Sequence, residues 1–216
     1  EVTGNGVTVQ RVEGSLSHEY IVVQNAAGTV TVTAEAHSSG TVEMTDGTNT
    51  VTARQLTVST STTGFTNVTA TYTSTGGSNT FTRQAVIRVV TFKLRVDGAV
   101  PVGGSNSSFA ISQSDLDTDV VIVTAEIDPV AFCIPHDLVS WSGDGMTAPD
   151  PLRRIISREN AGAKLVSAML AGTTISVEID VLVDPSQSGP FSFTNVIYAS
   201  SGLNYSANPN LTQYQI

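Results

Sequence analysis

The chain has 216 residues, of which 13% are charged, and its 19 acidic and 10 basic residues give a formal net charge of -9. An acidic chain with two lysines attracts neither phosphate backbones nor anionic membrane surfaces, so we expect no nucleic-acid partner. No apolar run approaches the roughly 18 residues of a membrane-spanning helix, and no membrane insertion is expected. The single cysteine allows no internal disulfide, and 40% hydrophobic residues favour a folded chain.

Alternation of apolar and polar residues with a period of two predicts β-strands along most of the chain. In the first half the alternating stretches are 7–12, 20–23, 29–36, 55–59, 68–72 and 81–89. In the second half the clearest is 174–183, where Ile175 and Val177 share one face and Glu178 lies on the other. Turn signals such as Asp46-Gly47 separate these stretches. An all-β protein is expected.

The sequence also repeats itself. Residues 30–35 (VTVTAE) match residues 121–126 (VIVTAE) at five of six positions, 91 residues apart. Four further strand-like stretches follow in the same order in each half, and Met44 takes the place that Trp141 has in the second half. A chain rich in Val and Thr can produce short matches by accident, but five elements in one order favour a duplication.

A repeat of about 90 to 95 residues with some seven short strands has the size of an immunoglobulin-like β-sandwich. The second half, with VSWSGDG, LRRIISREN and KLVSAMLAGTTISVEIDV, resembles the bacterial immunoglobulin-like domains of adhesins, invasin-like proteins and other exported proteins. The resemblance covers residues 91–184 and, with fewer shared features, 7–90. It implies two tandem immunoglobulin-like β-sandwiches, residues 1–90 and 91–184, followed by a C-terminal tail, residues 185–216.

The phase of the alternation changes between the two halves. From Phe81 to Val89 the apolar residues fall on odd positions, and from Val90 to Val96 they fall on even positions. A slip of one residue turns every side chain to the opposite face of a sheet. We therefore expect a bulge at Val89-Val90 or the transition from one sandwich to the next. No Gly, Pro or polar spacer lies there, so the domains should meet directly and move little.

The tail differs from the rest of the chain. It carries no charged side chain after Asp184, and it contains the alternating piece Phe191-Ser192-Phe193. It could be an ordered segment that adds one strand to the second sandwich, the start of a third module, or an exposed recognition arm. Tyr198, Tyr205 and Tyr214 are the candidate binding aromatics for a sugar or another partner.

The best candidate for a metal site is an acidic stretch just before a predicted strand. Asp115, Asp117 and Asp119 stand at alternate positions, and carboxylates in a loop can converge on calcium. The stretch lacks the Gly and the distal Glu of an EF-hand loop. The alternative is a solvated turn whose aspartates deter edge pairing. Apart from this possible calcium, no cofactor is expected.

Four apolar residues lie on the nominally wet faces of their strands: Ile122, Leu165, Met169 and Leu182. Apolar side chains on a wet face indicate a second buried surface. The partner domain or the tail could cover them, or they could form a docking patch for another chain.

No nucleophile, general acid and general base can be assembled from the sequence motifs, so an enzyme is not expected. The leading interpretation is a non-catalytic stalk, spacer or adhesive region of an exported bacterial surface protein, located outside the cell or on its surface. Its partner would be another protein or a glycan surface. The alternatives are an accessory region of a secreted enzyme or toxin, and a viral or phage structural protein such as a capsid or decoration protein.

Overall fold

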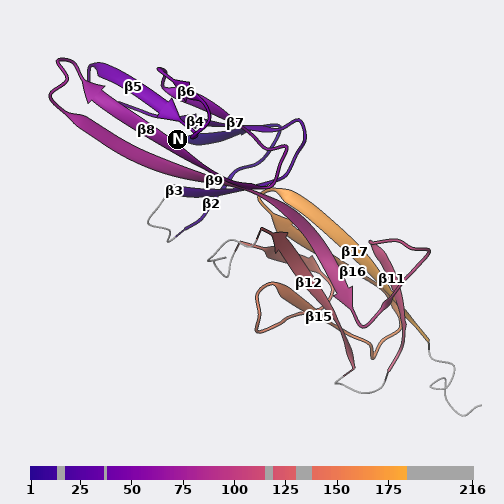
Figure 1. Ribbon diagram of the computed structural model, residues 1–216. Helices are drawn as coiled ribbons and strands as arrows, with labels where there is room; N and C mark the ends of the chain where they lie inside the picture. The colour runs from indigo at the N-terminus through magenta and orange to yellow at the C-terminus, as the bar shows by residue number, and fades with distance from the viewer. Residues whose placement is uncertain (14–17, 37, 115–118, 130–137, 184–216) are drawn as a thin grey trace, which may run out of the picture.

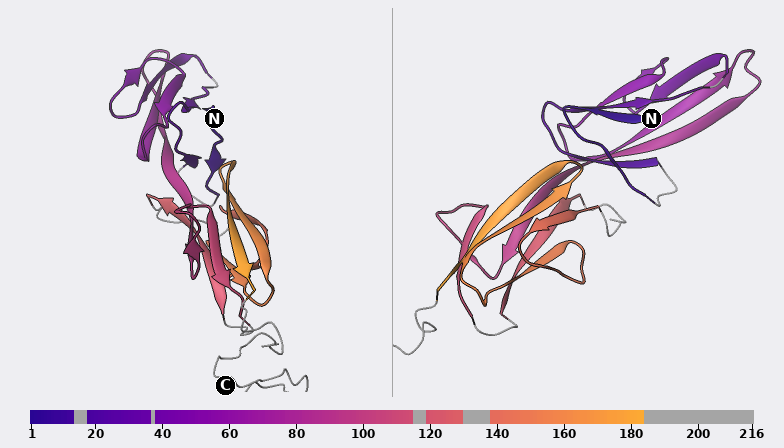
Figure 2. Two further views of the ribbon diagram at one scale, coloured as in Figure 1. Left: turned by 90° about the vertical axis from the view of Figure 1, so that its right-hand side faces the viewer. Right: turned by 180° about the vertical axis from the view of Figure 1, so that it is seen from behind.

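A computed structural model describes residues 1–13, 18–36, 38–114, 119–129 and 138–183. These residues form seventeen strands and no helix, which confirms the all-β prediction. The strands build two β-sandwiches that lie end to end, and strand β9 (Thr80–Asp97) runs through both (Figure 1). Figure 2 shows the same arrangement from two further sides. The predicted tail, residues 185–216, lies outside the described residues.

The first sandwich has a three-stranded antiparallel sheet facing a larger one. The smaller sheet has the order β1 (Val2–Asn5), β4 (Thr29–Thr33), β7 (Gln55–Ser59). The larger one contains, in spatial order, β2 (Gln10–Arg11), β3 (His18–Val23), the first half of β9, β8 (Gly64–Ser74), β5 (Gly40–Thr45) and β6 (Thr50–Val51). Strand β3 runs parallel to β9, and the other pairs are antiparallel.

The second sandwich repeats this plan. One sheet has the order β10 (Val100–Pro101), β11 (Ser108–Ser112), β17 (Thr173–Leu182), β16 (Gly162–Leu170), β13 (Ser140–Gly143), with β11 parallel to β17. The facing sheet contains β14 (Met146–Thr147), β15 (Arg153–Ser157), β12 (Val120–Asp128) and the second half of β9.

The period-two pattern explains why these segments are strands with one buried face. In β12 the residues Val121, Val123, Ala125 and Ile127 are buried, and those between them are half-buried. β-Branched side chains suit a pleated strand, and burying one face against the other sheet forms the core of each sandwich.

The two sandwiches share their register as well as their strand order. Val30 of β4 pairs with Val58 of β7, as Val121 of β12 pairs with Ile156 of β15. Each sandwich has one parallel pair at the same place, β3 with β9 and β11 with β17. Two facing sheets with this strand order form an immunoglobulin-like sandwich. The fold is therefore a tandem of two immunoglobulin-like β-sandwiches.

Strand β9 passes from one hydrophobic core to the other without a break. Val89 is buried in the core of the first sandwich, and its neighbour Val90 is buried in the core of the second. Successive side chains of a strand point to opposite faces, so adjacent residues can enter different cores.

Strand β3 joins the cores in the same way. Its Val22 packs in the first core, whereas Ile21 packs in the second, and both are fully buried. One strand with each face in a different core ties the two sandwiches together by burial of apolar surface.

A polar clasp adds to the junction. The side-chain carbonyl of Gln10 accepts a hydrogen bond from Ala171 N–H at 2.8 Å, and its amide donates to Leu138 O at 3.4 Å. Ala171 and Gly172 form the β16–β17 turn, in which both residues have positive φ. A Cβ on Gly172 would lie 2.6 Å from Thr8 Oγ1, so the turn is packed closely against the first sandwich.

Candidate functional site

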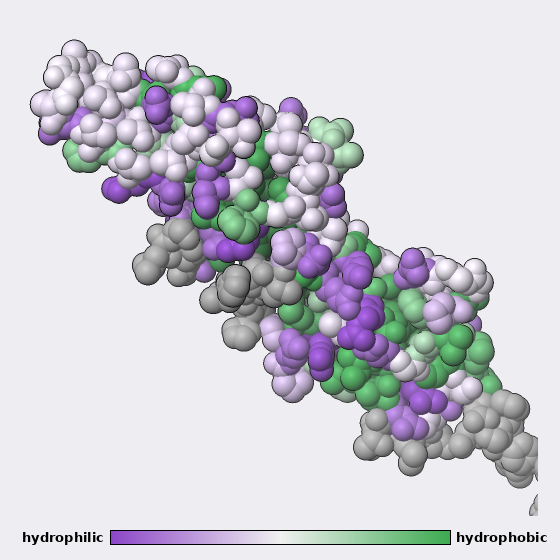
Figure 3. All heavy atoms as spheres, in the orientation of Figure 1, coloured by the Kyte–Doolittle hydropathy of each residue, from purple (hydrophilic) through white to green (hydrophobic). Residues whose placement is uncertain are grey.

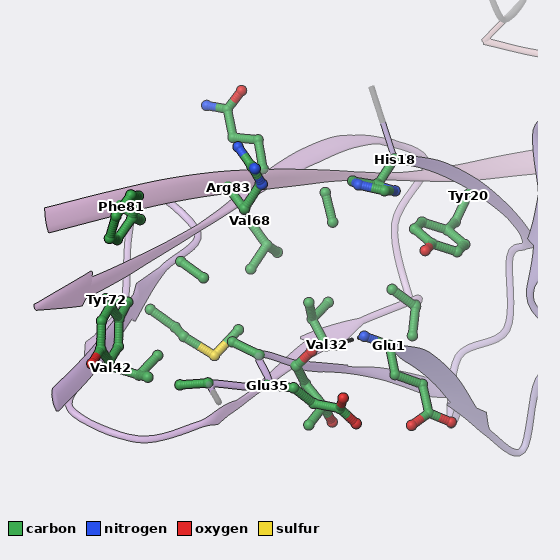
Figure 4. A pocket seen from close by; sticks show the side chains of 18 of the residues that line it. Glu1, His18, Tyr20, Val32, Glu35, Val42, Val68, Tyr72, Phe81 and Arg83 are labelled. Atoms are coloured by element: carbon green, nitrogen blue, oxygen red, sulfur yellow. Dashed lines mark hydrogen bonds between the residues drawn. The ribbon is translucent and has the colours of Figure 1, made fainter. Parts of the chain in front are cut away.

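A cleft of about 530 Å³ lies between the two sheets of the first sandwich (Figure 4). Its apolar lining comes from both sheets: Val32, Val42, Met44, Val68 and Ala85, all of them buried. A volume of this size lies within the range of small-molecule pockets.

The two walls of the cleft differ in their polar side chains. His18, Tyr20 and Arg83 lie along one wall, on β3 and β9, while Glu1 and Glu35 lie on the other (Figure 4). Within the described residues, neither Arg83 nor the neighbouring Arg11 forms an ion pair. The cleft therefore offers an apolar floor with ionisable groups at its edge.

One end of the cleft is closed by two aromatic rings. Tyr72 and Phe81 stack with ring centroids 6.4 Å apart. The Tyr72 hydroxyl donates to Ser39 O at 2.9 Å and lies 2.6 Å from Ser38 Oγ. These bonds fix the ring and hold the loop before β5 against the end of β8.

The repeat explains why the cleft is open. At four positions around it, the first sandwich carries a smaller or a charged side chain than the second: Ala36 for Ile127, Ala85 for Val177, Met44 for Trp141 and Arg83 for Ile175. Protein cores are close-packed, so the loss of side-chain volume at matching positions leaves space unless the backbone closes. These four differences contribute to the space that the cleft occupies.

The acidic stretch is only partly described. Asp115 and Asp117 lie outside the described residues. The Asp119 carboxylate accepts a hydrogen bond from Ser114 Oγ at 2.6 Å and lies 3.8 Å from Arg158 Nη1. Asp119 thus already has a cationic neighbour, and the described residues contain no group of three or more metal-ligating side chains. The calcium site stays a prediction, and calorimetric titration with calcium tests it.

The four residues of the predicted docking patch do not share one surface. Leu165, Met169 and Leu182 lie on β16 and β17 with exposed fractions of 53%, 44% and 48%, whereas Ile122 lies on β12 in the opposite sheet. A hydrogen-bonded serine pair, Ser167–Ser176, separates Leu165 from Met169 on the sheet face. The first sandwich covers none of the three exposed side chains. Alternation identified the outer faces of these strands but could not assign the strands to sheets.

The other predicted binding residues, Tyr198, Tyr205 and Tyr214, lie outside the described residues. Their role as sugar- or partner-binding aromatics stays a prediction.

A charged ladder covers the outer face of β9 and β12 in the second sandwich. Glu126 bonds to Lys93 Nζ at 3.1 Å and to Arg95 Nε at 2.7 Å, and Arg95 also bonds to Asp97. The hydrogen bond from Lys93, followed by the charges of both cations, lowers the pKa of Glu126. Figure 3 shows hydrophilic side chains gathered beside hydrophobic ones on the second sandwich, while the surface of the first is mostly pale, of intermediate hydropathy.

Sequence reasoning missed the cleft and the Gln10 clasp. A signal for the cleft was present, because residues 30–36 and 121–127 differ at only two positions, and at one of them Ala36 replaces Ile127. No sequence signal identifies Gln10, because its partners Leu138 and Ala171 are more than 120 residues away.

No family model matches the sequence, and no curated protein matches it. Among solved structures, the chain is similar to Drosophila OTK extracellular domains 3–5, with 16% identity, 82% of this chain and 62% of that chain covered, and a TM-score of 0.42. It is also similar to the titin I-band fragment I67–I69, with 13% identity, 84% of this chain and 65% of that chain covered, and a TM-score of 0.43. A third similar structure is that of the Clostridium thermocellum CbhA fibronectin(III)-like modules, with 16% identity, 82% of this chain and 94% of that chain covered, and a TM-score of 0.34. The chain thus spans less than two thirds of the OTK and titin chains. Strand order and register define the fold without these scores.

In the part of the chain that the structure describes, no helix has the length and apolar character needed to cross a membrane.

Proposed function

We propose that this chain is a non-catalytic structural and binding module, a rigid stalk or spacer region of an exported bacterial surface protein. The observation that carries the proposal is the continuous strand β9, whose adjacent residues Val89 and Val90 are buried in different cores. A hinge between domains needs exposed backbone that can change its dihedral angles. Here the backbone at the junction is hydrogen-bonded in β-sheets on both sides.

The interlocking of β3 and the Gln10 clasp support the same role. Bending the junction would expose Ile21, which is fully buried in the second core, and would break the bonds from Gln10 to Ala171 and Leu138. A stalk projects a binding surface at a fixed distance and angle, and a stiff junction serves that purpose. The proposed partner is another protein or a glycan surface.

The composition supports a location outside the cell. The net charge of -9 with few lysines favours solubility and disfavours nucleic acids, and a core of two sandwiches needs no disulfide. The resemblance of the second half to domains of exported bacterial proteins points the same way.

Spin labels test the rigidity. Nitroxides at Thr57→Cys in the first sandwich and Glu178→Cys in the second, in a Cys133→Ser background, should give a narrow distribution of distances between the labels. Both positions are exposed on strands, so the labels should leave the fold intact. A broad or multimodal distribution would contradict the proposed stalk.

Location needs a separate measurement. Antibodies against the purified chain should label intact cells of the organism that encodes it. Labelling that appears only after the cells are permeabilised would contradict the surface location while leaving the rigidity untouched.

A further inference from the structure

One sheet edge of the first sandwich is open where its counterpart in the second sandwich is covered. After β13 the chain adds β14 to the edge of β15, with Met146 opposite Ile155 and Thr147 opposite Arg154. After β5 the chain adds β6 to β5 instead. Strand β7, the counterpart of β15, therefore has a neighbouring strand on one side only among the described residues. That neighbour is β4, which separates β7 from β1, so the open edge faces away from the N-terminal strand.

The phase of the β4–β7 ladder shows which backbone groups of β7 are left unpaired. Ala34 N–H donates to Arg54 O at 2.8 Å, and Thr60 N–H donates to Gly28 O at 3.1 Å. Hydrogen-bonded pairs alternate along an antiparallel ladder, so the even-numbered residues of β7 bond to β4. The backbone N–H and C=O groups of the odd-numbered residues point away from β4 and have no hydrogen bond within the described part of the chain: Gln55, Thr57 and Ser59.

The β7 edge lacks the features that keep sheet edges from pairing with another chain. Edge strands are commonly protected by a very short length, by proline, by charged side chains or by a bulge. Strands β2, β6 and β14 have two residues each, and β10 contains Pro101. At the end of β13, the Arg154 side chain donates to Gly143 O and Asp144 O, both at 3.2 Å. Strand β7 has five residues in unbroken register with β4, and residues 55–82 carry no charged side chain.

The unpaired groups of β7 fit a second copy of the same strand. In an antiparallel pair with Thr57 opposite Thr57, Gln55 of each copy lies opposite Ser59 of the other. Every residue with free backbone groups then faces another such residue, and each of these residue pairs exchanges two backbone hydrogen bonds. We propose that the β7 strands of two copies of this chain pair in this register and join their three-stranded sheets into one continuous sheet.

The side chains along this edge suit the same pairing. Thr3, Thr31 and Thr57 lie in one row across the outer face of the sheet, and the row continues into Thr57 of the second copy. Threonines that lie opposite each other on neighbouring strands stabilise a sheet, and no like charges meet along the contact. Leu56 and Val58 stay buried in their own core. The second copy thus supplies a strand with free groups in the matching phase and without an opposing charge.

The contact uses the same surface on both copies, so it closes into a two-fold dimer and does not continue into a filament. The strands of the first sandwich run along the length of the molecule (Figure 1), and the paired strands are antiparallel, so the second sandwiches of the two copies extend in opposite directions. Copies that project from two facing surfaces would meet in this way. This inference goes beyond the proposed stalk, because the rigidity of one copy does not depend on the pairing of copies. Excess unlabelled chain removes distances between the labels of two copies, so the two proposals can fail separately.

Cysteine cross-linking of the full chain tests the register, again in the Cys133→Ser background. Thr57→Cys places the thiols of two copies opposite each other, where the Cα atoms of a hydrogen-bonded pair lie about 5.5 Å apart, within the range of a disulfide. This variant should form a disulfide-linked dimer under mild oxidation. Thr3→Cys, exposed on the same face of the sheet but two strands from the edge, is the matched control and should not. Failure of Thr57→Cys to cross-link more than Thr3→Cys would overturn the proposal.

Sedimentation velocity gives the second readout. The full chain should form a dimer, and no larger species, as its concentration rises to about 500 µM, which covers micromolar dissociation constants. Thr57→Lys brings two like charges together at the centre of the contact and should weaken association at least about tenfold. Thr3→Lys adds the same charge away from the edge and should leave association unchanged, and circular dichroism checks that both variants keep the fold. A chain that stays monomeric throughout, or that associates equally with and without Thr57→Lys, would contradict the inference.

Discussion

Met44 of β5 and Trp141 of β13 occupy the same place in the two sandwiches. Met44 pairs with Ala70 across β8, and Trp141 pairs with Ala168 across β16. Trp141 packs against the second core and donates its indole N–H to Pro151 O at 2.8 Å. Met44 is fully buried, makes no such bond and lines the cleft. The two halves thus share a backbone plan and differ in how much of the interior they fill.

Restoring the missing volume should stabilise the first sandwich. Ala36→Ile and Ala85→Val introduce the side chains that the second sandwich carries at these places, Ile127 and Val177. Each should raise the free energy of unfolding by about 1 kcal/mol, because apolar carbons enter a hollow without overpacking. Urea denaturation measures the change, with Ala36→Ser and Ala85→Ser as controls for substitution alone. A loss of stability in Ala36→Ile and Ala85→Val would mean that the backbone has already closed the space.

Removal of the Gln10 clasp should loosen the junction. Gln10→Ala deletes the hydrogen bonds to Ala171 and Leu138 and should lower the free energy of unfolding by about 1 to 2 kcal/mol. The distance distribution between spin labels on the two sandwiches should broaden. Gln24→Ala, which removes a single bond to Ser61 O within the first sandwich, is the matched control and should leave that distribution unchanged.

Proteases should not cut the chain at residues 88–92. A protease needs exposed, unpaired backbone, whereas β9 is paired with β8 up to Val89, with β3 up to Val90 and with β12 from Thr91. Limited trypsin digestion, which would target Arg88 and Lys93, should leave both bonds intact while the fold persists. Mass spectrometry of the fragments reports the cuts, and one dominant early cut after Arg88 would show that the junction opens.

The Asp46 turn should make stability depend on pH. The Asp46 carboxylate accepts hydrogen bonds from the backbone N–H groups of Asn49 at 2.6 Å and Thr48 at 2.8 Å, and from the Asn49 side chain. The hydrogen bond from the Asn49 backbone is the largest cause that lowers the pKa of Asp46 below its ordinary value of 3.8. Because the pKa of Asp46 is lowered in the folded state, the stability that its hydrogen bonds contribute is fully present above pH 3.8. That stability is lost as the pH falls through the pKa that Asp46 has in the folded chain.

Two substitutions test this prediction. Asp46→Ala should lower the free energy of unfolding by about 1 kcal/mol at pH 7, because the turn is exposed and water weakens its bonds. Asp46→Asn keeps an acceptor for the backbone bonds but cannot titrate. The difference in stability between the native chain and Asp46→Ala should shrink between pH 5 and pH 2, whereas that between Asp46→Asn and Asp46→Ala should stay constant. A native-minus-Ala difference that does not change with pH would exclude the carboxylate as the cause.

Much of the fold could be predicted because a strand with one buried face has a simple period. The stretch 174–183 showed which residues face the core, and β17 has the buried residues Val177, Ile179 and Val181. The repeat provided the strand order, because residues 30–35 and 121–126 begin equivalent series of strands.

Other features could not be predicted, because they depend on which strands become neighbours. Strand β3 (His18–Val23) is apolar on both faces at its end, and this pattern does not reveal that Ile21 and Val22 enter different cores. The same limit applies to Ile122, since alternation identifies an outer face but not the sheet to which it belongs. The cleft depends on the volume of the side chains around it, whereas a pattern of apolar and polar residues does not distinguish Ala36 from Ile127.

Because the last strand of one sandwich is the first strand of the next, neither half can be excised as a cassette. A break after residue 90 would remove Ile21 and Val90 from the interior of the second half, and would leave Ile21 exposed in the first half. Excised alone, each half would expose apolar side chains that the pair keeps buried.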